Sequence, residues 1–124
     1  MFADRMSQYF LSVAYSGTYD YNIAYVGTNE HIMIKSFKHK GLKKFYQKGD
    51  SSGLDQSLVP RLKNRLSMLD AAKTIDFMNQ QGYDLHELNG NRADTWSVKV
   101  SGNWRLTFIF ENGDVYVLNL EDYH

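Results

Sequence analysis

Residues 95–120 read TWSVKVSGNWRLTFIFENGDVYVLNL and contain three runs of β-prone residues. In the first two runs, apolar side chains recur at every second position, which is typical of strands with one buried face. Two short turns separate the runs, at Ser101-Gly102 and at Glu111-Asn112-Gly113. Because short turns join antiparallel neighbours, the segment predicts a meander of three strands.

Upstream of this meander, the pattern predicts a further strand over residues 84–88, ending at the turn Asn89-Gly90-Asn91. Leu85 and Leu88 cannot both face the core of a regularly alternating strand, so this strand should be bulged or buried on both faces. His86 should then point outward across an open face of the sheet.

Two helices are expected before the sheet. Leu42, Phe45 and Tyr46 have helical spacing, and Gly49 closes a short helix. Leucines repeat every three to four residues in a second helix of about four turns, at positions 58, 62, 66 and 69. Pro60 is tolerated only in a first turn, so that helix should begin near residues 56–58. With a short alternating strand over residues 34–37, the fold class is α+β: a short strand, two N-terminal helices and an antiparallel meander sheet that the helices cover on one face.

The domain organisation divides near Met33. Residues 33–124 read as one self-sufficient domain, whereas residues 1–32 are rich in Tyr, Ser, Gly and Asn and carry no helical period or chemical motif. Two interpretations of residues 1–32 are open: an added β-hairpin, or sequence upstream of a true start at Met33. We favour the second.

Several classes of protein are excluded by composition. The chain has no cysteine, which rules out disulfides and thiolate metal sites, and its four histidines lack the spacing of helical metal ligands. We therefore expect no metal and no cofactor. No apolar run approaches the roughly 20 residues of a membrane span, and the start lacks the features of a secretory signal, so a cytoplasmic protein is expected.

The net charge is zero, but basic residues are concentrated in residues 35–48, which contain no acid. Such a stretch is either a surface that docks on nucleic acid or a solvated helix face. Its members are Lys35, Lys38, Lys40, Lys43, Lys44 and Lys48.

The last residues, Glu121-Asp122-Tyr123-His124, follow the final strand directly. Their acid, phenol and imidazole groups can accept and donate protons. Arg105 should face away from Trp104 and Leu106, on the open side of the sheet, as a phosphate binder or in a surface salt bridge. The meander should bring Lys99, Arg105 and the C-terminal segment together. Such a set suits metal-free RNA cleavage by a 2′-hydroxyl, because that reaction needs a proton acceptor, a proton donor and a cation.

From Met33 onward the chain resembles the HigB branch of the RelE/ParE superfamily of toxin–antitoxin toxins. The resemblance rests on residues 34–42, on Arg65-Leu66, on Leu85-His86-x-Leu88-x-Gly90, on Trp96-Ser97, on Asn103-Trp104-Arg105, on Asn112-Gly113-Asp114 and on the closing residues 121–124. It implies a ribosome-dependent mRNA endonuclease that cuts codons in the A site of the 70S ribosome. It also implies a HigA-like helix-turn-helix antitoxin, through which alone the toxin reaches operator DNA.

The resemblance implies roles for particular residues. His86, Asp122, Tyr123 and His124 fall on catalytic positions, and residues 122–124 should face His86 and Arg105 across the sheet. Asn103 and Arg105 fall on positions that engage mRNA, with Lys99 beside them, and the lysines of residues 35–48 would dock on ribosomal RNA. Two rival hypotheses remain: a non-catalytic, ParE-like inhibitor that binds DNA gyrase or another protein, and a domain that blocks translation by occupying RNA.

Overall fold

The computed structural model describes residues 33–123. Residues 33–45 and 51–123 form one compact unit, and residues 46–50 are described by themselves. The proposed N-terminal extension at residues 1–32 and the terminal His124 lie outside the described residues.

Helix α1 spans Lys40–Lys48 and buries Leu42 and Phe45. The His39 imidazole accepts a hydrogen bond from the Leu42 N–H in its first turn, at 3.1 Å. Gly49 follows the helix with a φ of +72°, a left-handed conformation that glycine adopts without strain. The expected short helix is confirmed.

Helix α2 spans Val59–Ala71 and follows a turn of 3₁₀ helix at Gln56–Leu58. Pro60 lies in its first turn, and the leucines at 58, 62, 66 and 69 are all buried, so both the start and the buried face were predicted correctly. Further 3₁₀ turns lie at Ile75–Met78 and Gly90–Arg92. Among residues 33–123, no helix is long and apolar enough to cross a membrane.

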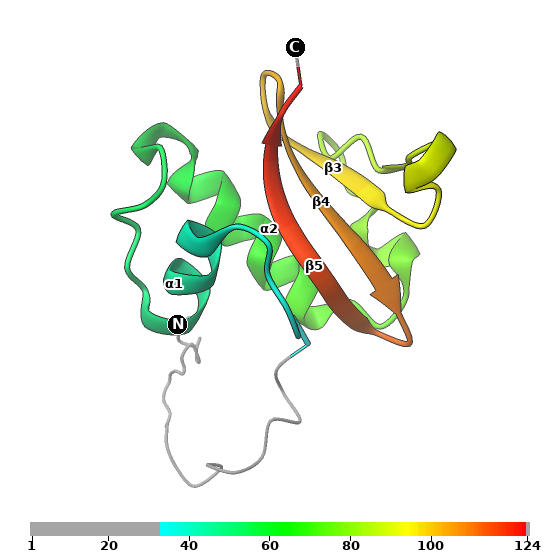
Figure 1. Cartoon of the computed structure of the whole chain (residues 1–124), viewed down its shortest axis with the longest axis horizontal. Coiled ribbons are helices and arrows are strands. Elements are labelled where there is room, and N and C mark those ends of the chain that lie inside the picture. Colours follow the sequence, from blue (N-terminus) through cyan, green and yellow to red (C-terminus); the bar gives the residue numbers. More distant parts are fainter. Residues whose placement is uncertain (1–32, 124) are drawn as a thin grey trace, which may run out of the picture. The chain divides into compact units, whose positions relative to one another are not determined.

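The sheet has four strands in the order β2-β3-β4-β5, and each pair is antiparallel. Their bounds are His86–Glu87 for β2, Trp96–Ser101 for β3, Trp104–Glu111 for β4 and Asp114–Asp122 for β5. Figure 1 shows β3, β4 and β5 as a meander of long strands. Asn112 and Gly113 both have positive φ, as a tight turn between β4 and β5 requires. The α+β class, with two helices and an antiparallel meander, is confirmed.

One face of the sheet belongs to the apolar core. Val98 is paired with Leu106, and Leu106 with Leu120, so these side chains share a face. All three are buried, as are the leucines of α2. Helix α2 is also tied to β3, because the Arg65 Nε donates to the Lys99 carbonyl oxygen at 3.1 Å.

A β-bulge interrupts the pairing of β4 with β5. Thr107 pairs with Asn119 but Ile109 pairs with Tyr116, so Val117 and Leu118 together oppose Phe108. Val117 has a φ of +54°, which is strained for a β-branched residue. The bulge shifts the alternation of β5 by one residue, which lets Val115, Leu118 and Leu120 all be buried.

Two expected strands are shorter than predicted. Residues 34–37 make only isolated parallel bridges to β5, Ile34 with Val115 and Phe37 with Leu118, because the bulge intervenes and the Val117 N–H donates to the Ser36 hydroxyl instead. The strand predicted over residues 84–88 is reduced to His86–Glu87, because Asp84 has a φ of +46°.

Candidate active site

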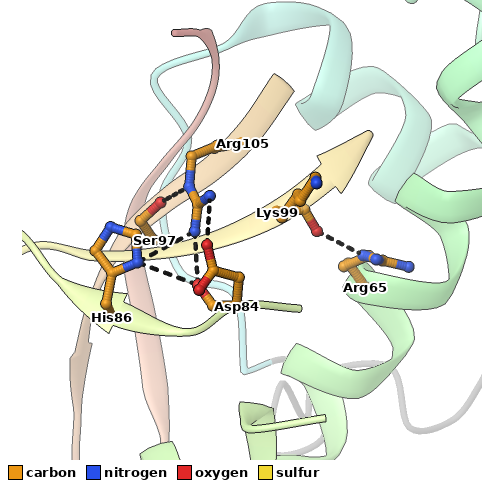
Figure 2. Close-up of polar contacts among 6 residues, drawn as sticks. All are labelled: Arg65, Asp84, His86, Ser97, Lys99 and Arg105. Carbon is orange, nitrogen blue, oxygen red and sulfur yellow. Dashed lines mark hydrogen bonds and ion pairs between the residues drawn. The ribbon is translucent and has the colours of Figure 1, made fainter. Parts of the chain in front are cut away.

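Arg105, on β4, lies at the centre of a polar cluster (Figure 2). Its Nε donates to the Ser97 hydroxyl. Its Nη1 donates to the Asp84 carboxylate at 3.2 Å, and its Nη2 donates to the Asp84 carbonyl oxygen at 2.6 Å. The His86 Nδ1 lies 3.4 Å from Nη2. The cluster therefore brings a cation, a carboxylate and an imidazole together.

The expectation that Arg105 lies on an open sheet face is wrong. Arg105 is only 9% exposed, and its neighbours on that face, Ser97 and Thr107, are buried as well. The reason is tertiary: Asp84 and His86, which precede β3 in the chain, contact the guanidinium directly. A buried arginine needs partners for its N–H groups, and Ser97 and Asp84 accept from three of the five.

Asp84 occupies a second bulge, at the start of β2. The Lys99 N–H donates to the Tyr83 carbonyl oxygen at 2.6 Å, whereas Ser97 pairs with His86, so Asp84 is the extra residue. Its positive φ turns both its carbonyl and its carboxylate toward Arg105. Bulges that re-aim side chains in this way are frequent beside active sites.

The residue before the bulge is anchored to α2. The Arg65 guanidinium lies over the Tyr83 ring, 4.2 Å from its centroid, and the Tyr83 hydroxyl donates to the Asn64 side chain at 2.5 Å. Burial raises the pKa of the Tyr83 hydroxyl and lowers the pKa of Arg65. The position of Asp84 is thus determined by contacts from both the helix and the sheet.

His86 is exposed, and its Nδ1 has two possible partners that exclude each other. The Asp84 carbonyl oxygen, 3.2 Å away, can only accept, so this contact needs a proton on Nδ1. Arg105 can only donate, so the contact at 3.4 Å needs a lone pair on Nδ1. When Nδ1 donates to the Asp84 carbonyl oxygen, the Nε2 atom of a neutral imidazole is an acceptor. When Nδ1 accepts from Arg105, Nε2 carries the proton and is a donor. Its geometry is compatible with either direction of proton transfer.

A second polar cluster lies around Glu121, which pairs with Arg105 across β4 and β5. The Glu121 carboxylate accepts two hydrogen bonds from Arg92, at 3.0 and 2.6 Å, and one from the Thr107 hydroxyl at 2.5 Å. The Arg92 hydrogen bond is the main cause that lowers the pKa of Glu121. The same bond raises the pKa of Arg92, and Tyr123 adds a smaller contribution, so Tyr123 lies beside this cluster.

The other predicted residues are distributed as follows. Asp122 pairs with Trp104, and the pleat directs its side chain to the face opposite Arg105. The orientation expected for Asp122 is therefore wrong, while its catalytic role stays a prediction. Lys99 is paired with Arg105 and exposed. The Asn103 carbonyl oxygen accepts from the Tyr123 N–H at 2.8 Å, which ties the end of β5 to the β3–β4 turn. His124 lies outside the described residues.

The lysines of residues 35–48 are all exposed. Lys40, Lys44 and Lys48 follow one another at four-residue spacing along α1, so they share one side of that helix. This arrangement is compatible with a docking surface and equally with a solvated face, so ribosome docking by these lysines stays a prediction.

Sequence reasoning missed Asp84, Ser97, Arg92 and Glu121 as parts of the polar clusters. Ser97 shares its parity with Lys99, which was a usable signal. Glu121 gave no such signal, because its orientation depends on a bulge that alternation does not reveal. For Asp84, the broken alternation indicated a bulge or burial on both faces within residues 84–88, but not that Asp84 would turn toward Arg105. Within residues 33–123, no group of three or more potential metal-binding side chains is close enough to hold an ion.

Comparison with known proteins adds an independent finding. Residues 35–124 match the family described as the RelE-like toxin of the type II toxin-antitoxin system HigB. A relative from Proteus vulgaris, named Endoribonuclease HigB, is 53% identical over 92 residues, which cover 74% of this chain and all of the relative. The family match includes all of the described residues except 33 and 34. The chain therefore belongs to the HigB family of RelE-like toxins of type II toxin-antitoxin systems.

Proposed function

We propose that the chain is an endoribonuclease that cleaves mRNA codons in the ribosomal A site and so inhibits translation. The similarity to a protein named as an endoribonuclease supports this activity. The structural observation that carries it is the contact between the Arg105 guanidinium and the His86 imidazole. A fixed cation beside a group that exchanges protons is what phosphodiester cleavage requires.

The proposed reaction is an attack of the mRNA 2′-hydroxyl on the adjacent phosphorus, with departure of the 5′-oxygen. One group takes the proton of the 2′-hydroxyl, and another protonates the departing oxygen. His86, Asp122, Tyr123 and His124 form the proposed catalytic set. Arg105 stabilises the extra negative charge on the phosphate in the transition state. No metal or cofactor is required, because protein side chains can supply each of these roles.

Other residues contribute to RNA binding in this proposal. Asn103 and Lys99 flank Arg105 at the β3–β4 turn and on β3, where they can contact mRNA. The lysines of residues 35–48 dock on ribosomal RNA, and binding should then weaken steeply with salt because each neutralised phosphate releases counterions. The ribosome supplies much of the acceleration by holding the mRNA in a conformation ready for attack.

The proposed partners follow from membership of the toxin family. A HigA-like helix-turn-helix antitoxin neutralises the protein and connects it to operator DNA, and the ribosome in the cytoplasm is its site of action. A rival, ParE-like action on DNA gyrase would need no proton-transfer groups beside Arg105.

Mapping of mRNA 5′ ends on programmed ribosomes tests the proposal. The wild-type protein should give cuts in phase with codons, and His124→Ala should reduce cleavage by about 10²-fold or more if His124 transfers a proton. Asp76→Asn, a change of an exposed residue on another element, is the matched control and should cleave like wild type. Equal toxicity of wild type and His124→Ala without cuts would instead favour binding to a protein or to RNA.

A further inference from the structure

Most of the N–H groups of Arg105 already donate hydrogen bonds within the protein. A guanidinium offers five N–H donors, and a phosphate is held best by a fork of two neighbouring ones. In this structure Nε, Nη1 and Nη2 each donate already, to Ser97, to the Asp84 carboxylate and to the Asp84 carbonyl oxygen. The fork that includes Nε is occupied, because the single N–H of Nε donates to Ser97. At the fork formed by Nη1 and Nη2, a phosphate oxygen competes with the two Asp84 oxygens that already bind these nitrogens.

The three acceptors differ in how easily they can be replaced. Ser97 is fully buried, and the Asp84 carbonyl belongs to a backbone that the Tyr83 contacts hold in place. The Asp84 carboxylate, in contrast, is 67% exposed and makes the longest of the three bonds, at 3.2 Å. Because this carboxylate lies largely in water, solvent competes for its charge, so its bond to the buried guanidinium is the easiest of the three to replace.

We propose that the Asp84 carboxylate occupies the anion-binding position of Arg105 and is exchanged for a phosphate oxygen when substrate binds. The Asp84 carbonyl and Ser97 stay in place and keep the guanidinium oriented during the exchange (Figure 2). The Asp84 carboxylate thus competes with the substrate phosphate for Arg105, whereas the Asp84 carbonyl oxygen remains bound to the guanidinium. The identification of the anion as an RNA phosphate rests on the proposed function.

The backbone conformation makes this hypothesis testable with one substitution. Asp84 has a φ of +46°, and asparagine tolerates left-handed φ as aspartate does. Asp84→Asn therefore keeps the bulge and the carbonyl contact and removes only the negative charge that competes with phosphate. Glu87→Gln is the matched control, because Glu87 is an exposed carboxylate on the same short strand, and its neighbouring position in the pleat directs it to the other face from His86.

The experiment titrates the full chain with inorganic phosphate and follows the backbone amide resonance of Ser97. The phosphate midpoint of Asp84→Asn should fall by about two- to five-fold relative to wild type, the change expected when an exposed carboxylate no longer competes for the guanidinium. Glu87→Gln should change the midpoint less than Asp84→Asn does. Equal midpoints, weaker binding by Asp84→Asn, or no phosphate response in either protein would overturn the proposal.

A double-mutant cycle identifies the route of the effect. In an Arg105→Gln background, Asp84→Asn should no longer tighten phosphate binding, because the carboxylate has no guanidinium to occupy. If Asp84→Asn still lowered the phosphate midpoint in the Arg105→Gln background, the cause would be the change in net charge, and the proposed exchange would be contradicted. Phosphate binding does not depend on RNA cleavage, so failure of the proposed nuclease activity and failure of this exchange give different results.

Discussion

Arg105 and Arg92 both bind a carboxylate beside the same face of the sheet, but their surroundings differ. The Arg105 side chain is 10% exposed. It donates to the Ser97 hydroxyl, to the Asp84 backbone carbonyl and to the Asp84 carboxylate. The Arg92 side chain is 43% exposed, and it donates two hydrogen bonds to the Glu121 carboxylate. The position of Arg105 is fixed by its bonds to buried Ser97 and to the Asp84 backbone. Arg92 mainly links the 3₁₀ turn at Gly90–Arg92 to Glu121 on β5. Burial, rather than the presence of a carboxylate, distinguishes the candidate catalytic cation from the structural one.

This difference predicts unequal costs of substitution. Removal of a buried donor leaves its partners without hydrogen bonds, and that costs the full desolvation of each group. Removal of an exposed donor lets water replace it, so little stability is lost. Three substitutions test the comparison.

The largest effect is expected for Arg105→Gln. The change leaves the Ser97 hydroxyl and the Asp84 carbonyl short of donors, and it should reduce the free energy of unfolding by about 1–3 kcal/mol. Cleavage of mRNA should fall by about 10²-fold or more, because the transition-state charge loses its cation. Urea unfolding measures the first effect and 5′-end mapping the second. Full activity in a folded Arg105→Gln protein would remove Arg105 from the proposed site.

A smaller, pH-dependent effect is expected for Glu121→Gln. The pKa of Glu121 is lowered by its hydrogen bond from Arg92, so its ionised form stabilises the folded state. This contribution, about 1 kcal/mol, should be fully present above the ordinary pKa of 4.5 and should be lost as the pH falls through the lower, folded value. Unfolding curves of wild type and variant should therefore converge in acid. A difference that is constant from pH 7 to pH 3 would contradict the role of the charge.

The smallest effect is expected for Arg92→Lys. Lysine keeps the charge but loses the two-pronged contact with Glu121, and an exposed pair of this kind should lose only about 0.5 kcal/mol. The small difference should shrink further in 0.5 M salt, whereas the effect of Arg105→Gln should not. Thermal unfolding at two salt concentrations measures this contrast. A loss comparable to that of Arg105→Gln would mean that exposure does not separate the two arginines.

Local sequence patterns predicted the regular elements well. The leucine spacing and Pro60 indicated where α2 begins and which side it buries, because helical periodicity and proline geometry are local properties. The turns at Gly102 and Asn112-Gly113 indicated the antiparallel order of β3, β4 and β5 for the same reason. The grouping of Lys99 and Arg105 also followed, because both positions alternate with the apolar residues of their strands, and a register shift between Lys99 and Ser101 places the two opposite each other.

The bulges at Val117 and Asp84 decided which acidic residues lie on the same face as Arg105. Without the bulge at Val117, the alternation of β5 would direct Asp122 toward the Arg105 face; with it, Glu121 takes that place. The bulge at Asp84 brings a carboxylate and a carbonyl to Arg105, and contacts from α2 to Tyr83 hold the residue before it. By itself, the sequence determined the class of fold, the helices and the strand order. The tertiary structure alone decided which acidic side chains reach the face of Arg105, because a one-residue shift costs little locally but exchanges the two faces of a strand.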